Sequence, residues 1–163
     1  MNISFRQALK EDLPQILNIE KESFEEPWPE EIFNLMLKNS FIKQTNKNSH
    51  NFYVCEDKNN IIGYIIWEKE YFYEKSKDIL HLVGHIINLC VKPEERRKSY
   101  GRKIIEFGLK KMIKSELNHC YLEVRESNFT ARRLYERVGM RYISKLNNYY
   151  LNEDGLVYTI ELR

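Results

Sequence analysis

The spacing of apolar residues along the chain has the period of a helix in some segments and the period of a strand in others. In residues 10–24 the apolar side chains recur at near-helical spacing, which predicts an amphipathic helix. A second helix is predicted from Pro29 onward, after the break "EEPWPEE", and a third over residues 100–116. A short fourth helix is predicted in "NFTARRLYERVG", where Asn128 can cap the start and Gly139 can end it.

Strand-like runs fill the intervals between these helices. They lie at residues 2–7, 52–57, 61–72, 80–91, 120–125, 140–151 and 156–162. The run 80–91 is apolar on both faces, which places it at the centre of a sheet. The polar segment 40–51 is expected to be a loop with a short strand at Phe41 and Ile42, and the charged segment 74–79 a second loop. The segment "NEDG", residues 152–155, is expected to be a hairpin turn.

The order of the predicted elements is β-α-α-β-β-β-α-β-α-β-β. Antiparallel hairpins flank a central β-α-β-α unit, which predicts an α/β fold with one mixed sheet of about seven strands and about four helices. A length of 163 residues suits one domain, so a single domain is expected over residues 1–163.

Composition and charge exclude several classes of protein. Hydrophobic residues make up 42% and charged residues 31%, which is typical of a globular protein. The net charge of +2 argues against a nucleic-acid partner for the chain as a whole. Cys55, Cys90 and Cys120 show no CxxC spacing, so buried thiols in a reducing compartment are expected, and no metal site. No signal peptide or membrane-spanning run is visible, and the protein is expected to be cytoplasmic, with no membrane partner.

The stretch "VKPEERRKSYGRKIIEFGLKK", residues 91–111, places cations at the start of a helix. A helix start already carries a partial positive charge and unpaired N–H groups, so further cations cost stability unless an anion binds there. Gly101 lets the backbone approach a ligand closely, and the surrounding amides can form a nest for phosphate. The cations of this site are Arg96, Arg97, Lys98, Arg102 and Lys103. The alternative is a solvated turn in which Glu and Arg residues pair.

Two motifs resemble the GCN5-related N-acetyltransferase family. The family's acetyl-CoA loop, Q/R-x-x-G-x-G/A, is similar to "RRKSYG" at residues 96–101, where Ser99 replaces the middle glycine. The stretch "LEVRESNFTARRLYERVGM" resembles the L-E-V-R-x-S-N-x-x-A-x-x-L-Y-E-x-x-G-F pattern of protein N-terminal acetyltransferases. "GHIINLCV" also resembles the archaeal N-terminal acetyltransferases, and the whole chain looks closest to these and to the ribosomal-protein-alanine acetyltransferases.

The resemblance implies acetyl-CoA as the cofactor, bound where the central parallel strands splay apart. Pantetheine would pair with the backbone of the strand that ends at Val91, and pyrophosphate would lie on the loop after it. If the loop keeps the family's shape, Ser99 must offer its amide without a strained positive φ. The implied cofactor-binding residues are Leu89, Cys90, Val91, Arg96, Arg97, Lys98, Ser99, Tyr100, Gly101, Arg102, Asn128, Ala131 and Tyr135.

Acetyl transfer to an amine needs a base near the amine and an acid near the leaving sulfur. By resemblance, Glu123 is the base and Tyr135 the acid, and a phenol with a pKa of about 10 suits protonation of a thiolate. His85 is a third candidate, as a base or as a relay for the amine proton. The alternatives are an outward-facing Glu123 paired with Arg125, and packing roles for Tyr135 and His85.

The peptide site is expected at the turn between the first two helices and at the hairpin "NNYYLNEDG". A carboxylate there could hold an ammonium group, and paired tyrosines could bind peptide backbone. The candidate residues are Phe24, Glu25, Glu26, Pro27, Trp28, Tyr149 and Tyr150. The alternatives are a hydrophobic staple of Phe24 and Trp28, and an edge strand in which the two tyrosines alternate between faces.

The leading hypothesis is transfer of acetyl from acetyl-CoA to the α-amino group of a nascent or ribosomal protein. A second hypothesis keeps the chemistry and changes the acceptor to a lysine side chain, a polyamine or a small amine. A third is a non-catalytic acyl-CoA-binding module. A nucleic-acid module is the last, since Tyr100 beside the basic cluster could stack on a base. The oligomeric state stays open.

Overall fold

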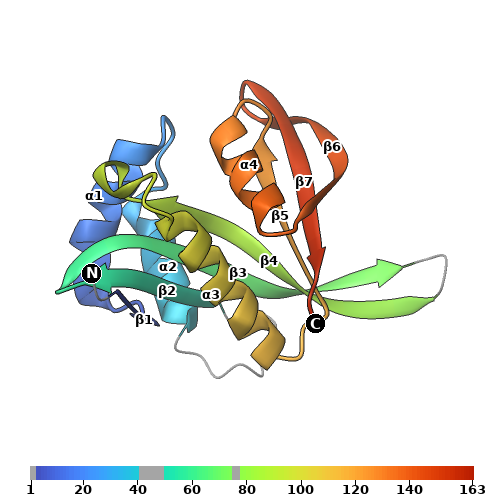
Figure 1. Cartoon of the computed structure of the whole chain (residues 1–163), viewed down its shortest axis with the longest axis horizontal. Coiled ribbons are helices and arrows are strands. Elements are labelled where there is room, and N and C mark those ends of the chain that lie inside the picture. The colour runs from blue at the N-terminus through green and yellow to red at the C-terminus, as the bar shows by residue number, and fades with distance from the viewer. Residues whose placement is uncertain (1–2, 41–49, 75–77) are drawn as a thin grey trace. The chain divides into compact units, whose positions relative to one another are not determined.

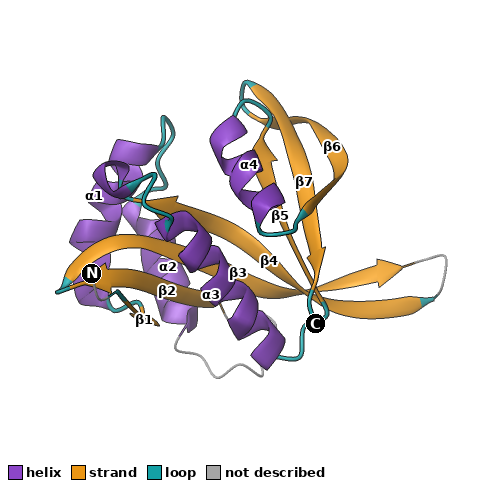
Figure 2. Cartoon of the chain, viewed as in Figure 1, coloured by secondary structure: helices purple, strands orange, loops and turns teal. Residues whose placement is uncertain are grey.

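The computed structural model describes residues 3–40, 50–74 and 78–163. These residues form seven strands and four α-helices in the predicted order (Figures 1 and 2). The elements are β1 (Ser4–Gln7), α1 (Leu13–Ser23), α2 (Glu30–Ser40), β2 (His50–Asp57), β3 (Asn60–Glu74), β4 (Ile79–Val91), α3 (Tyr100–Lys114), β5 (His119–Arg125), α4 (Phe129–Arg137), β6 (Arg141–Tyr150) and β7 (Glu153–Glu161), with single 3₁₀ turns at Lys10–Asp12 and Pro93–Glu95. Within the described ranges, no helix is both long and apolar enough to cross a membrane.

The strands form a mixed sheet in the order β1-β2-β3-β4-β5-β7-β6. Strand β4 stands fourth of seven, as its two apolar faces predicted, and the α/β fold class is confirmed. The parallel pairs of β4 and β5 run from Val83 opposite His119 to Ile86 opposite Leu122, although β4 continues to Val91. Backbone pairing that ends before the strand itself ends is expected where two parallel strands splay apart.

The chain divides into two compact units, each made of two segments. The first holds residues 1–68 and 88–105, and the second holds residues 69–87 and 106–163. The expectation of one domain over residues 1–163 stays a prediction.

The core of the first unit is aromatic. Phe33 of α2 packs between Phe52 of β2 and Tyr64 of β3, with ring centroids 6.2 and 5.9 Å away. All three side chains are fully buried, and burying a side chain of this size contributes about 1.5–3 kcal/mol. This packing holds α2 against β2 and so fixes the end of the turn that precedes the helix.

The second unit carries a helix with clear start and stop signals. The Asn128 side chain accepts a hydrogen bond from the Ala131 amide at 3.1 Å, which confirms the predicted cap of α4. Gly139 follows the helix with a φ of +95°, a conformation that glycine adopts without strain. Tyr135 of α4 packs on Tyr158 of β7, with centroids 6.1 Å apart, and thereby ties α4 to the sheet.

The predicted turn "NEDG" is wrong. Strand β6 runs to Tyr150 and β7 already begins at Glu153, so the hairpin turns at residues 151 and 152. Charge pairing explains the longer strand, because Asp154 accepts a bond from the Asn148 amide at 2.7 Å and pairs with Lys145 at 2.8 Å. The loop expected over 40–51, with its strand at Phe41 and Ile42, lies mostly outside the described residues, as do residues 75–77 of the second loop.

Candidate active site

Strand β5 brings three functional side chains to one face of the second unit. Its burial alternates, with Cys120, Leu122 and Val124 buried and the residues between them partly exposed. Because side chains of a strand alternate between faces, Tyr121, Glu123 and Arg125 share the other side. The alternation "CYLEVR" therefore places a carboxylate between a phenol and a guanidinium.

Glu123 binds His85. The Nε2 atom of His85 lies 2.7 Å from a carboxylate oxygen of Glu123, and the two side chains are 13% and 14% exposed. The parallel register of β4 and β5 sets His85 opposite Tyr121, and the two rings stack 4.3 Å apart. Arg125, the partner that the alternative gave to Glu123, pairs with Glu153 at 3.3 Å.

A second carboxylate, Glu70 of β3, completes a chain of hydrogen bonds. One oxygen of Glu70 lies 3.1 Å from Nδ1 of His85, and the other accepts a bond from the Tyr121 hydroxyl. Both ring nitrogens of His85 thus face a carboxylate. Burial is the largest influence on the pKa of His85 and lowers it, but the bonds and charges of Glu123 and Glu70 together raise that pKa above its usual value.

The hairpin tyrosines lie within electrostatic reach of Glu123. Burial, and then the charges of Glu123 and Glu70, raise the pKa of Tyr149. Burial also raises the pKa of Tyr150, with Tyr149, Glu123 and Tyr135 adding to the shift. The Arg125 guanidinium stands 4.5 Å over the Tyr150 ring. The second unit therefore gathers the predicted catalytic residues and both hairpin tyrosines.

Tyr135 itself is buried, with 7% of its surface exposed. This burial, together with the packing of its ring on Tyr158, fits a packing role. The cap residue Asn128 and the first-turn residue Ala131 begin the same helix. The three residues expected to face the thioester thus belong to one short helix.

The basic loop of the first unit has a strained backbone. Arg97 and Ser99 have φ values of +64° and +65°, in the left-handed region that glycine prefers. The requirement that Ser99 avoid positive φ is therefore not met. The loop adopts the glycine-like conformation with a serine in place, and a left-handed non-glycine residue costs about 1–2 kcal/mol.

Two cations of this loop are already engaged. The Arg96 guanidinium donates to the Val91 carbonyl at 3.1 Å and to the Ser23 hydroxyl at 2.8 Å. Lys98 pairs with Glu95 at 3.0 Å, an ion pair within the turn, although the solvated-turn alternative expected Glu to pair with Arg. Arg96 therefore ties the end of α1 to the end of β4, in addition to any contact with an anion.

The loop nonetheless fits a phosphate group. The side chains of Arg96, Arg97, Lys98 and Arg102 are exposed, and helix α3 begins directly behind them. The first amides of a helix have no partner within it, so they favour an anion at this point. Tyr100 is buried and Gly101 is partly exposed, which leaves the entrance of the helix open on the Gly101 side.

Gly63 allows strands β3 and β4 to lie close together at residues 89–91. A Cβ atom at Gly63 would stand 2.3 Å from the carbonyl oxygen of Cys90 and 3.2 Å from the Cα of Val91. Only a residue without a side chain fits here. The backbone of Leu89, Cys90 and Val91, expected to bind pantetheine, is thus backed by β3.

The expected peptide turn is anchored by a buried carboxylate. Glu20, 1% exposed, accepts hydrogen bonds from the Trp28 amide at 3.0 Å and from the Tyr64 hydroxyl. Burial, as the largest cause, raises the pKa of Glu20, while these bonds oppose that shift. The Trp28 ring packs on Phe33 of α2 at 5.7 Å, a different partner from the Phe24 of the staple alternative. The turn residues Phe24, Glu25, Glu26 and Pro27 are exposed.

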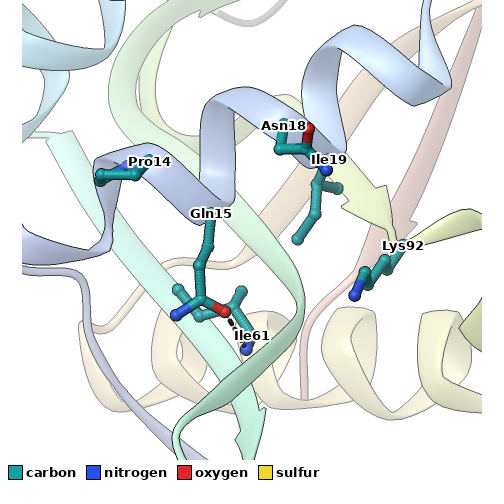
Figure 3. Close-up of a pocket in the computed structure, with 6 residues that line it drawn as sticks. All are labelled: Pro14, Gln15, Asn18, Ile19, Ile61 and Lys92. Carbon is teal, nitrogen blue, oxygen red and sulfur yellow. Dashed lines mark hydrogen bonds between the residues drawn. The ribbon is translucent and has the colours of Figure 1, made fainter.

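A surface hollow of the first unit lies elsewhere. It has a volume of about 360 Å³ and is lined by Pro14, Gln15, Asn18, Ile19, Ile61 and Lys92 (Figure 3). Gln15 crosses it and accepts a bond from the Ile61 amide at 2.9 Å. Lys92 is its one titratable lining residue, so the hollow holds no acid–base pair.

Sequence reasoning missed Glu70, Tyr121 and Glu20. A signal for Tyr121 was available, because it stands two positions before Glu123 and must share its face of the strand. Glu70 lies in "WEKEYF", where a carboxylate on a strand is a weaker signal. Glu20 lies on the buried, apolar face of α1, and nothing in the sequence indicates which groups it binds.

Known proteins are similar to this chain over most of its length. The acetyltransferase (GNAT) family model matches residues 13–140. An N-alpha-acetyltransferase of Saccharolobus solfataricus is 31% identical over 91% of this chain and 86% of its own length. A putative [ribosomal protein bS18]-alanine N-acetyltransferase of Bacillus subtilis is 30% identical over 90% of this chain and 87% of its own. The crystal structure of Arabidopsis thaliana NAA60 in complex with acetyl-CoA is 19% identical, has a TM-score of 0.82, and covers 99% of both chains.

Proposed function

Because the chain belongs to the acetyltransferase (GNAT) family and is an acetyl-CoA-dependent N-acetyltransferase, we propose that it acetylates the α-amino group of protein N-termini. The observation that carries the proposal is the pairing of Glu123 with His85 at 2.7 Å in the second unit. A carboxylate joined to an imidazole is suited to take a proton from an ammonium group. The N-terminal amine, with a pKa of about 8, is the acceptor closest in proton affinity to a histidine.

The proposed chemistry takes two protons from the substrate nitrogen, one before its C–N bond to the acetyl group forms and one after, and delivers one proton to sulfur as the C–S bond breaks. The second nitrogen proton restores the Tyr135 hydroxyl after it has protonated the sulfur. Acetyl-CoA, when bound, supplies the acetyl thioester. Glu123 accepts a proton from the α-ammonium, directly or through water, and passes it to His85, so that the free amine can attack. The Tyr135 hydroxyl donates a proton to the departing thiolate, for which a phenol has a suitable pKa of about 10.

Relatives support an N-terminal acceptor over a lysine, a polyamine or a small amine. Proteins about 30% identical over nine tenths of this chain are named N-alpha-acetyltransferase and ribosomal-protein-alanine acetyltransferase. The second unit adds Tyr149 and Tyr150, with rings 5.0 Å apart and perpendicular, beside Glu123. Phenols of this kind can bind peptide backbone and pack a side chain. We assign the turn of Phe24, Glu25, Glu26, Pro27 and Trp28 to the same substrate.

We propose cofactor-binding residues in each of the two units. In the first unit these are the backbone of Leu89, Cys90 and Val91 for pantetheine, and residues 96–102 for pyrophosphate. In the second unit they are Asn128, Ala131 and Tyr135 of α4. The partner we propose is the N-terminus of a nascent or ribosomal protein in the cytoplasm, where the buried free thiols would stay reduced.

The test is acetyl-CoA titration by calorimetry, followed by measurement of free-thiol release with peptides that begin Ser, Ala, Met-Leu or Met-Glu. Thiol release with an N-terminal peptide, and none with an α-acetylated peptide that contains lysine, is the expected result. Release with the lysine peptide instead would move the acceptor to a side chain. Binding without release from any peptide would contradict the proposal and favour small amines or a binding role.

A further inference from the structure

Glu70 links His85 of the proposed base to Tyr121 of β5, which lies on the same face of that strand as Glu123. One of its oxygens lies 3.1 Å from Nδ1 of His85, and the other accepts a bond from the Tyr121 hydroxyl. Tyr121 also stacks on the imidazole, with the ring planes 6° apart. The His85 ring is therefore held on its face by Tyr121 and along both edges by carboxylates.

A neutral imidazole has one N–H, and its position decides which nitrogen can accept a proton. Two carboxylates compete for that N–H, Glu70 at Nδ1 and Glu123 at Nε2. Glu70 is 38% exposed and accepts a bond from Tyr121, whereas Glu123 is 14% exposed. Because solvent exposure and the Tyr121 hydroxyl keep the Glu70 carboxylate ionised, we assign the N–H of the neutral ring to Nδ1, where Glu70 accepts it. Nε2 is then the atom that accepts a proton, and its 2.7 Å contact with Glu123 becomes a hydrogen bond when a proton lies between the two atoms.

We propose that Glu70 is a positioning residue of the base, which fixes the Nδ1–H tautomer of His85 and stabilises the imidazolium that forms during acetyl transfer. The inference rests on the proposed function. An N–H bond of the substrate ammonium breaks, Glu123 takes the proton and gives it up again, and an N–H bond forms at Nε2 of His85. Glu70 stays ionised throughout, and Tyr121 fixes its carboxylate.

The groups that face His85 come from three strands. Glu70 lies on β3, with Glu68 two residues before it and therefore on the same face. Glu123 and Tyr121 lie on β5, and Tyr149 of β6 is close enough for Glu70 and Glu123 to raise its pKa. On the opposite face of β4, the neighbour is uncharged, since Gly84 lies against Met112 of α3. Glu70 contacts Nδ1 of His85 at 3.1 Å.

The first experiment compares kcat across pH for the wild type, Glu70→Gln and Glu70→Ala. Glutamine keeps an acceptor for the Nδ1–H but removes the charge. We expect the acid limb of the kcat profile to move to lower pH in both variants, because an imidazolium without Glu70 loses its proton more readily. Maximal kcat should fall roughly 10- to 100-fold in Glu70→Ala and less in Glu70→Gln, with KM for peptide and acetyl-CoA nearly unchanged. Glu161→Gln, an exposed carboxylate of the same unit, is the matched control.

The second experiment reads the tautomer directly from the ¹⁵N shifts of the His85 imidazole, assigned by its loss in His85→Gln. We expect an Nδ1–H tautomer at high pH in the wild type and in Glu70→Gln, and a mixture of tautomers in Glu70→Ala. An Nε2–H tautomer in the wild type, or an acid limb that does not move, would overturn the proposal. If the wild type acetylated no N-terminal peptide, the proposed function would fail while the ¹⁵N shifts would still decide the tautomer.

Discussion

His85 and Glu123, 38 positions apart in the chain, join their side chains through a hydrogen bond of 2.7 Å. The parallel register of β4 and β5 causes this, since it sets His85 beside the row that holds Tyr121 and Glu123. The sequence left two separate candidates for the base. Their direct contact makes them one acid–base unit, in which removal of either member should disable proton transfer.

Glu123→Gln is expected to lower kcat by roughly two orders of magnitude, because glutamine keeps the shape and cannot accept the ammonium proton. The dissociation constant for acetyl-CoA should stay within about twofold, since the proposed phosphate site lies on other residues. Thiol release and calorimetry measure the two quantities, with Glu161→Gln as the control. Near-normal turnover of Glu123→Gln would remove this carboxylate from the mechanism.

The raised pKa of His85 predicts a pH-dependent contribution to stability. A histidine whose folded pKa exceeds its unfolded value of about 6.5 stabilises the fold fully below that value, and the stabilisation disappears as pH rises through the folded pKa. The unfolding free energy of the wild type should therefore exceed that of His85→Gln by more at pH 6 than at pH 9. Urea denaturation at both pH values checks this. A difference that grows toward pH 9 would show that the neutral form is the stabilised one.

The fold could be predicted from the sequence because its signals are local. The apolar run that contains His85 identified the central strand, and Asn128 and Gly139 marked the ends of α4. The "NEDG" turn failed because turn-forming residues can also pair across a hairpin when their charges are matched, as Asp154 is by Lys145. Pairing across strands is a property of register, which the sequence does not show.

The site residues that belong to a sequence motif could be predicted. Those that are brought together only by the packing of strands could not. The stretch around Glu123 and Tyr135 supplied both positions and roles as hypotheses. The partnership of Glu70 with His85 depends on two strands that lie side by side, so no local pattern could reveal it. The left-handed backbone conformation of Ser99 could not be predicted from the sequence either, because serine rarely adopts that conformation.

Tyr135→Phe is expected to reduce kcat by about tenfold, less than Glu123→Gln, because water can supply the proton to the thiolate in place of the phenol. Phenylalanine preserves the packing of this buried ring on Tyr158, so stability should change little. Measurement of thiol release between pH 6 and 9.5 checks the prediction. Unchanged turnover at every pH would leave Tyr135 with a packing role alone.

Ser99→Gly should stabilise the protein and tighten acetyl-CoA binding. Glycine relieves a left-handed conformation that costs about 1–2 kcal/mol, against about 0.4–1 kcal/mol lost through the greater freedom of the unfolded chain. The net gain is between about 0 and 1.6 kcal/mol in unfolding free energy. Glu116→Gly, at a φ of +61° beyond the end of α3, is the control that relieves strain away from the phosphate loop. If both variants gained stability and neither bound acetyl-CoA more tightly, the backbone conformation of Ser99 would have no effect on cofactor binding.

Glu20 offers a test of how the peptide turn is held. Glu20→Ala leaves buried donors, the Trp28 amide and the Tyr64 hydroxyl, without an acceptor, which should cost roughly 2–4 kcal/mol. Glu20→Gln keeps an acceptor and removes a charge whose burial raises the pKa of this carboxyl. A carboxyl group with a raised pKa stabilises the fold at low pH and loses that contribution as pH rises through its folded pKa. Glu20→Gln should therefore gain stability relative to the wild type as pH increases from 4 to 8, as measured by urea denaturation. A loss that grows over this range would mean that the ionised carboxylate, through its donors, is the form that holds the turn.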